Sequence, residues 1–182
     1  MKVCFDFDKT LTKRDTLIGF YKHCATSIAT FYMKMIAYSL YVICYKVRLI
    51  SNEQLKRNGL KLFLRGLDQE EYKGYSLSYG NSIETTDLFL SLNKHLEKGH
   101  KVYIVTASFT DYVKAVFRNL KLEVVGSEIN FVEGKIHNIR RNCFGEEKVN
   151  QLKELGIKKL DVFYTDSFDD KPLMDISNKV YL

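Results

Sequence analysis

Three short apolar runs, each followed by polar residues, constrain the fold of this chain most. They occupy residues 2–7, 101–106 and 160–165. Continuous apolar runs of this length are typical of parallel strands buried on both faces of a sheet. Helical patterns over residues 83–98, 111–120 and 146–155 separate or follow them, and residues 180–182 suit a last strand. The alternation predicts an α/β fold with a Rossmann-like parallel sheet.

Two segments depart from this alternation. Residues 124–139 read as a β-hairpin with its turn at Glu133 and Gly134. Residues 15–80 read as an all-helical insertion between the first two strands. We therefore expect a core built from residues 1–14 and 81–182, and a helical cap built from residues 15–80.

The most apolar part of the insertion, residues 24–45, carries one charge, Lys34. Its length would suffice for a transmembrane helix. Lys34 falls near its middle, however, and Thr and Ser residues are interspersed, which favours a buried or interfacial helix pair.

The positive charge of the chain is concentrated in the insertion. The net charge is +6, and residues 13–65 hold ten Lys or Arg against two acids, a local net charge of +8. Such a segment favours anionic partners, either phosphorylated substrates or lipid headgroups at a membrane surface. The alternative is a solvated basic helix face. No nucleic-acid recognition motif is present, so no nucleic-acid partner is expected.

The cysteines and the N-terminus indicate the compartment. Cys4, Cys24, Cys44 and Cys143 are widely spaced and form no CxxC pair. Free thiols are typical of a reducing cytosol, and no signal peptide is visible. We expect a cytoplasmic protein, either free in the cytosol or peripheral at the inner face of a membrane.

Two aspartates one residue apart, Asp6 and Asp8, end the first apolar run. Buried carboxylates this close repel each other unless a cation offsets their charge. Mg²⁺ takes oxygen ligands and usually one or two carboxylates, and Asp166 is a natural additional ligand. With the cation present, Asp6 suits a nucleophile that forms an aspartyl-phosphate, and Asp8 suits a general acid and base.

Phosphoryl transfer also needs groups that hold the phosphate oxygens. Thr106, Ala107 and Ser108 follow the second run, where a hydroxyl and backbone N–H groups at the start of a helix would bind an anion. Lys148 is a candidate cation on the opposite side. Asp170 suits a group that orients Lys148 or a metal-bound water.

Taken together, these motifs resemble those of the haloacid dehalogenase superfamily of phosphatases. The matching stretches are "DFDKT" at residues 6–10, Thr106 in "VTAS", Lys148, and "TDSFDD" at residues 165–170. The resemblance is to the phosphoserine-phosphatase-like branch, which has a helical cap after its first strand.

This resemblance implies a Mg²⁺-dependent phosphomonoester hydrolase and a role for each site residue. Asp6 would be the nucleophile and Asp8 the acid and base. Mg²⁺ would be held by the Asp6 side chain, the Asp8 carbonyl and Asp166. Phosphate binding would fall to Thr106, Ala107 and Lys148, and the supporting residues behind these groups would be Thr10, Ser167, Asp169 and Asp170.

The substrate is left open between two classes of phosphate ester. Asp15 stands nine residues after the nucleophile, the spacing at which phosphoserine phosphatases read the substrate amine, and a cap arginine (Arg14, Arg48, Arg57 or Arg65) would read its carboxylate. The stretches "CFGEEKVNQL" and "YTDSFDDKPLM" instead resemble phosphatidylglycerophosphatase C, a lipid phosphatase of the same branch. A phosphomutase and a non-catalytic binding module are the remaining alternatives, and the oligomeric state is not predicted.

Overall fold

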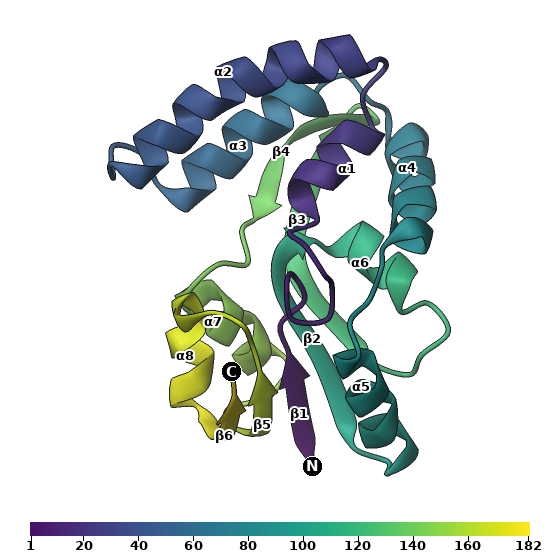
Figure 1. The fold of residues 1–182 in the computed structure, drawn as a ribbon, viewed down its shortest axis with the longest axis vertical. Helices are drawn as coiled ribbons and strands as arrows, with labels where there is room; N and C mark the ends of the chain where they lie inside the picture. Colours follow the sequence, from purple (N-terminus) through teal and green to yellow (C-terminus); the bar gives the residue numbers. More distant parts are fainter.

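The computed structural model describes residues 1–182 and contains a six-stranded sheet in the order β4-β3-β2-β1-β5-β6 (Figure 1). The strands are β1 (Lys2–Phe5), β2 (Lys101–Phe109), β3 (Glu123–Val132), β4 (Lys135–Arg141), β5 (Leu160–Tyr164) and β6 (Ser177–Tyr181). All neighbouring strands run parallel except β3 and β4, which pair antiparallel as the predicted hairpin. The predicted α/β fold is confirmed.

Helices cover both faces of the sheet, which explains why the central strands are apolar throughout. Val3 and Phe5 of β1 belong to a cluster that includes Leu92 of α5 (Leu88–Glu97) and Tyr112 of α6 (Thr110–Val116). Cys4 points to the other face, where it packs in a cluster with α7 (Glu146–Glu154) and α8 (Lys171–Asp175). Alternate residues of one strand therefore enter two separate cores.

Several element boundaries differ from those predicted. The first strand ends at Phe5, and the helix expected over residues 111–120 ends at Val116. Three further boundaries are set by pairing with distant segments. The helix expected over residues 83–98 begins only at Leu88, because Thr85 pairs with Thr12 and the Thr86 N–H donates to the Leu11 carbonyl at 2.9 Å. The second strand continues to Phe109, and the last strand is longer than residues 180–182. In each case pairing with a distant segment overrides the local pattern.

Four helices follow β1 within the segment predicted to be helical. They are α1 (Leu17–His23), α2 (Ile28–Lys46), α3 (Asn52–Phe63) and α4 (Gln69–Ser82). Capping boxes begin two of them: Ser51 with Gln54 at α3, and Asp68 with Glu71 at α4. The pair of helices expected within residues 24–45 is wrong, because this stretch forms mainly the single helix α2, which packs along α3.

Helix α2 is largely uncovered. Only Phe31 and Tyr38 are buried among its 19 residues. It is the one helix long and apolar enough to cross a membrane, although length and composition alone are weak grounds for a membrane span.

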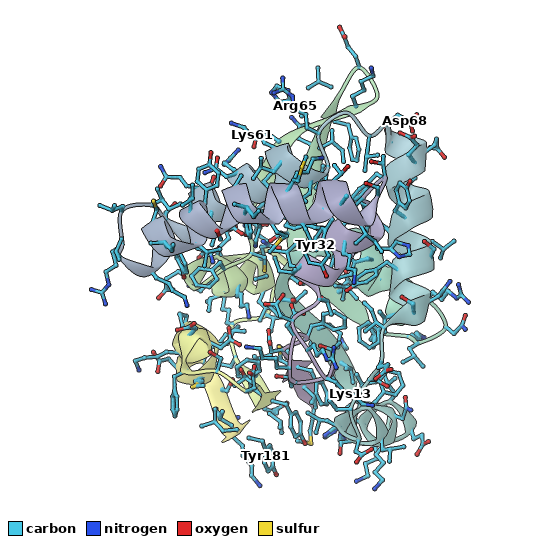
Figure 2. The ribbon with its side chains drawn as sticks, turned by 45° about the horizontal axis from the view of Figure 1, so that its top comes forward. Lys13, Tyr32, Lys61, Arg65, Asp68 and Tyr181 are labelled. Carbon is cyan, nitrogen blue, oxygen red and sulfur yellow. The ribbon has the colours of Figure 1, made fainter.

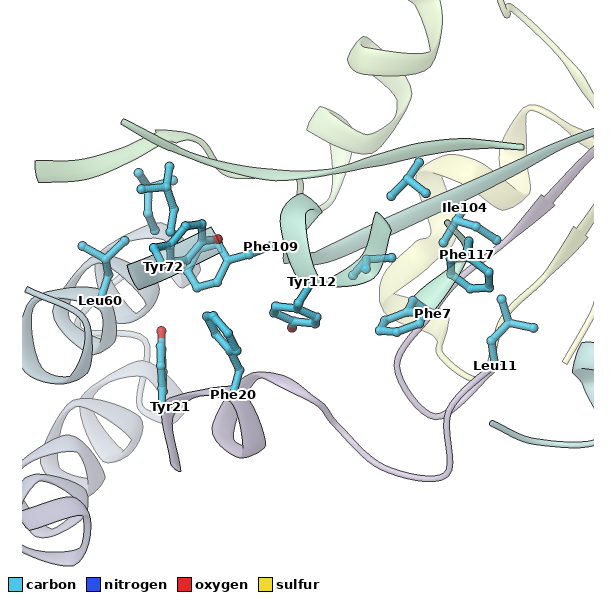
Figure 3. Packing of buried hydrophobic residues seen from close by; sticks show 14 of the residues in the cluster. Phe7, Leu11, Phe20, Tyr21, Leu60, Tyr72, Ile104, Phe109, Tyr112 and Phe117 are labelled. Atoms are coloured by element: carbon cyan, nitrogen blue, oxygen red, sulfur yellow. The ribbon is translucent and has the colours of Figure 1, made fainter. Parts of the chain in front are cut away.

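A continuous aromatic core joins the sheet to these helices (Figure 3). Phe20 of α1 lies 4.8 Å from Tyr112 of α6 between ring centroids, and Tyr21 stacks on Phe63 of α3 at 4.7 Å. The β3–β4 hairpin adds a second connection, since the Gly134 carbonyl accepts from the Gln69 N–H of α4 at 2.8 Å. Packed aromatic side chains and the contact with the hairpin therefore fix the helices that follow β1 to the sheet.

The contact between α4 and α6 depends on a residue without a side chain, Gly80. A Cβ atom there would lie 2.5 Å from both the Ala115 Cβ and the Tyr112 carbonyl oxygen. We expect Gly80→Ala to lower the free energy of unfolding by about 1–3 kcal/mol through overpacking. Gly74→Ala on the same helix meets nothing within 4 Å and should instead raise it by about 1 kcal/mol.

Chemical denaturation of the two variants and the wild type measures both effects. Equal changes in the two variants would show that the close approach of α4 to α6 does not control stability.

Candidate active site

A cavity of about 370 Å³ lies between the carboxyl ends of the central strands and the helices α1, α2 and α3. The strand side supplies the polar groups: Asp6, Asp8, Thr106, Ala107, Ser108, Asp166, Ser167, Asp169 and Asp170, with Lys148 from α7. The helix side supplies mainly apolar groups: Leu17, Ile18, Tyr38, Val42 and Leu55. The cavity thus brings together the predicted catalytic, phosphate-binding and metal-binding residues, which lie far apart in the sequence.

At the base of the cavity Lys148 lies between two buried carboxylates. Its ammonium donates to Asp6 Oδ1 at 2.8 Å and to Asp170 Oδ1 at 2.5 Å. Burial lowers the pKa of Lys148, but the charges of Asp6 and Asp170 raise it by more, so the net shift is upward. The lysine is therefore held in its charged form, and Asp170 is itself fixed by the Thr165 hydroxyl at 2.9 Å.

Asp6 keeps one oxygen directed at the cavity. Its Oδ1 accepts from Lys148, whereas Oδ2 accepts no hydrogen bond within the protein. Burial raises the pKa of this carboxyl, and the neighbouring charge of Lys148 opposes the shift. A carboxylate that is buried, oriented by a cation and free on one oxygen is suited to nucleophilic attack.

The Asp8 carboxylate is held by Thr16, which precedes α1, and by Ser108 near the end of β2. Its Oδ1 accepts from the Thr16 N–H at 2.7 Å and from the Thr16 hydroxyl at 2.6 Å, and its Oδ2 accepts from the Ser108 hydroxyl at 2.6 Å. Burial, followed by the charge of Asp15, raises the pKa of Asp8, and these hydrogen bonds oppose the rise. A raised pKa suits a group that must both give and take a proton.

The oxygen atoms present fit a magnesium ion. No three His, Cys, Asp or Glu side chains cluster to hold a metal by themselves, and the Asp8 side chain is occupied as described. Asp6 and Asp166 both line the cavity, and each keeps an oxygen that accepts no hydrogen bond. Mg²⁺ typically binds one or two carboxylates and completes its shell with water and phosphate oxygens.

The segment predicted to bind phosphate differs from its predicted form. Thr106, Ala107 and Ser108 do not begin a helix; they lie near the end of β2, and α6 starts at Thr110. The Thr106 hydroxyl accepts from the Ser108 N–H at 3.0 Å, and its proton is free to point into the cavity. A strand end, where the β2–β3 register shifts after Val105, thus replaces the expected helix terminus.

Of the remaining predicted residues, Asp15, Ser167 and Asp169 line the cavity, whereas Thr10 is buried, does not line it and contacts Asp166. Thr10 donates to Asp166 at 3.4 Å, and Ser167 accepts from the Asp169 N–H at 3.1 Å. Asp15 lines the cavity while its carboxylate accepts from the Leu17 N–H at 3.0 Å. Of the four arginines considered for a substrate carboxylate, none lines this cavity.

The sequence did not single out Lys56, the most unusual side chain in the cavity. Its ammonium, on α3, is buried and donates to the Ala107 carbonyl at 2.6 Å, to the Ser127 hydroxyl at 3.0 Å and to Asn142 Oδ1. None of these partners is a carboxylate. A lysine at helical spacing with Gly59, Leu60 and Phe63, the buried stripe of α3, was the available signal.

The sequence profile of the haloacid dehalogenase-like hydrolase family matches residues 3–175. The chain therefore belongs to this family of hydrolases, as its motifs predicted. No curated protein sequence matches the chain.

Several solved structures share the fold. A protein of unknown function from Bordetella pertussis Tohama I superposes with a TM-score of 0.77 at 19% identity, over 96% of this chain and 86% of that one. A substrate-bound phosphoserine phosphatase superposes with a TM-score of 0.68 at 17% sequence identity, over 98% of this chain and 83% of that one. A phospho-aspartyl intermediate analogue of phosphoserine phosphatase superposes with a TM-score of 0.62 at 16% sequence identity, over 98% of this chain and 91% of that one. Identities this low establish the shared fold.

Lys56 makes stability depend on pH in a way that can be measured. Burial lowers its pKa from 10.5 to about 8. Since the folded state releases this proton more readily than the unfolded state, wild-type stability rises between about pH 8 and 10.5 relative to a variant without the lysine. From pH 7 to pH 9.5 the unfolding free energy of wild type minus that of Lys56→Met should increase by about 2 kcal/mol.

Denaturant titrations at the two pH values provide this difference. The matched control is Lys61→Met, which removes an exposed lysine from the same helix and should leave the difference constant. A Lys56→Met difference that stays constant or falls with pH would contradict the assigned burial of the charge.

Proposed function

We propose that this protein is a Mg²⁺-dependent phosphomonoester hydrolase that works through an aspartyl-phosphate on Asp6. The observation that carries the proposal is the buried Asp6 carboxylate, bound on one oxygen by Lys148 and free on the other, at the base of a cavity of about 370 Å³. Two of the structures that share its fold are phosphoserine phosphatases, one captured as an analogue of a phospho-aspartyl intermediate.

In the first half-reaction the free oxygen of Asp6 attacks phosphorus. An O–P bond forms to Asp6 while the P–O bond to the leaving alcohol breaks. Asp8, protonated at the start, gives its proton to the leaving oxygen. Lys148 and the Thr106 hydroxyl stabilise the negative charge on the transferring phosphoryl group.

In the second half-reaction a water molecule attacks the same phosphorus. Asp8, now ionised, takes a proton from this water, and the bond from phosphorus to Asp6 breaks. Inorganic phosphate leaves and both carboxyl groups return to their starting states. The hydrogen bonds from Thr16 and Ser108 hold Asp8 in one orientation through both steps.

The oxygens of Asp6, Asp166 and the Asp8 carbonyl would hold the Mg²⁺ ion. When bound, the ion neutralises charge between the Asp6 carboxylate and the substrate phosphate. Lys148, which donates to one Asp6 oxygen and to Asp170, supplies a second positive charge from the chain itself.

We propose a small phosphorylated metabolite as the substrate, with phosphoserine as the first candidate. Asp15 lines the cavity and is available to a substrate amine. The expected arginine for a carboxylate is not there, and Lys56 is engaged by three oxygens. The cavity therefore offers the amine contact of a phosphoserine site without an arginine for the carboxylate.

A phospholipid headgroup is the second candidate, because the helix side of the cavity is apolar. A non-catalytic binding module is disfavoured, since binding alone would not require the full set that lines the cavity: Asp6, Asp8, Thr106, Lys148 and Asp166. All four cysteines are free, which supports a cytoplasmic location.

The proposal predicts Mg²⁺-dependent phosphate release that depends on Asp6. Asp6→Asn removes the nucleophile and should lower kcat by more than about 10³-fold, and Asp8→Asn by about 10²–10⁴-fold. Asp87→Asn is the matched control, because Asp87 is exposed and its side chain caps no helix. EDTA should abolish release from the wild type, and added Mg²⁺ should restore it.

The assay uses p-nitrophenyl phosphate, phosphoserine, sugar phosphates and phosphatidylglycerophosphate, and analysis of the products separates hydrolysis from transfer to a second alcohol. Activity that survives Asp6→Asn would contradict the assigned nucleophile. Preference for the lipid ester over all soluble esters would select the second candidate.

A further inference from the structure

The outer face of α2 is apolar along its whole length and covered by nothing in the chain. Its exposed side chains include Ile28, Met33, Ile36 and Leu40, each exposed by 60% or more. Figure 1 shows α2 at the top of the molecule, with α3 and the rest of the chain on one side of it. Soluble proteins rarely leave so long an apolar face in water, so this face indicates an interaction surface.

We propose that α2 is a membrane-docking helix, lying flat in the interface of a bilayer that contains anionic lipids. The inference concerns a partner of the protein and does not depend on its catalytic chemistry.

The charge of the segment around α2 favours an anionic bilayer as the partner that covers this face. Residues 16–52 contain no Asp or Glu, and their basic residues are Lys22, Lys34, Lys46 and Arg48. Lys22, Lys46 and Arg48 are exposed. An apolar helix face bordered by basic side chains is the pattern of helices that bury one face among lipid chains while their cations contact anionic headgroups.

Aromatic side chains on the same helix strengthen this assignment. Tyr32, which is labelled in Figure 2, is 57% exposed, and Tyr41 is 37% exposed. Tyrosine is enriched at the level of the headgroups, because its ring is apolar and its hydroxyl is polar.

The connections of α2 favour a helix in the plane of the membrane over one that spans it. Its inner face is already used: Phe31 and Tyr38 are buried, and Tyr38 and Val42 line the catalytic cavity. Both neighbours, α1 and α3, contact α2 and belong to the same core. A spanning α2 would require α1 and α3 to lie on opposite sides of the bilayer, and their packing would be lost.

A second copy of the chain fits the face less well. A parallel two-fold pairing of α2 with itself would bring the basic side chains Lys46 and Arg48 of both copies together, and an antiparallel pairing would place them at the other end of the partner helix; in neither case does the segment offer an acid to pair with them. Anionic headgroups neutralise the same charges.

Docking through α2 would also set the position of the catalytic cavity. Tyr38 and Val42 line the cavity from the inner face of α2. An α-helix is about 10 Å wide with its side chains. The cavity would therefore lie about one helix diameter from the membrane surface.

The chain contains no tryptophan, so one introduced tryptophan reports from a known position. We would place it at Ile36 on the outer face, and at Leu90 on α5 as the matched control, since Leu90 is 63% exposed but lies outside α2. With vesicles of phosphatidylcholine and phosphatidylglycerol, Ile36→Trp should shift its emission to shorter wavelength and be quenched by brominated lipid. Leu90→Trp should show neither change.

Two further variants distinguish a flat helix from a spanning one. Ile28→Trp and Val47→Trp, near the two ends of α2, should be quenched at the same shallow depth as Ile36→Trp. Deep quenching at residue 36 with shallow quenching at both ends would show a spanning helix and overturn the flat arrangement.

Vesicle sedimentation measures how much the apolar face of α2 contributes to membrane affinity. The wild type should sediment with the anionic vesicles, and Ile36→Glu/Leu40→Glu should lose this binding by at least about tenfold while Leu90→Glu retains it. An unchanged circular dichroism melt shows that the double variant is folded. No sedimentation of the wild type, or equal sedimentation of the double variant, would overturn the proposal. A wild-type dimer that binds no vesicles and that the double variant dissociates would assign the face to a second copy instead.

Discussion

The ion pairs of Lys148 with Asp6 and Asp170 are the interaction on which the site depends. Three charged groups are buried together at the ends of β1 and β5, and each alone would be costly to remove from water. Lys148 satisfies one oxygen of Asp6 and leaves the other open to the cavity. The same contact therefore compensates the burial of Asp6 and leaves free the oxygen that attacks phosphorus in the proposed mechanism.

The helical insertion completes the site from the opposite side. Lys56 of α3 reaches Ala107 at the end of β2, and Thr16 before α1 holds Asp8. These polar contacts cross between the sheet and the helices where the aromatic core of Phe20 and Tyr112 already fixes them together. The helices therefore hold two parts of the proposed site in place: Asp8, the proposed acid and base, and the end of β2, the proposed phosphate-binding segment.

The sequence predicted the site residues where a catalytic motif stands next to a short apolar run. Asp6, Lys148 and Asp166 could be assigned to one site because each stands in a recognisable motif after or between buried strands. The end of β2 and the start of α5 could not be predicted, since Thr85 and the residues after Val105 are placed by pairing with distant strands and loops. Lys56 was missed because only tertiary structure shows that a lysine in a basic segment is buried against uncharged oxygens.

Trapping of the covalent intermediate tests the central claim most directly. We would mix enzyme, Mg²⁺ and p-nitrophenyl phosphate, quench in acid within a turnover, and map phosphorylated peptides by mass spectrometry. Asp8→Asn slows the hydrolysis step, whereas the intermediate still forms because the p-nitrophenolate leaving group needs little protonation. The account predicts one phosphoryl group on Asp6, absent from Asp6→Asn. Rapid phosphate release without a phosphorylated Asp6, or with the phosphoryl group on another residue, would contradict it.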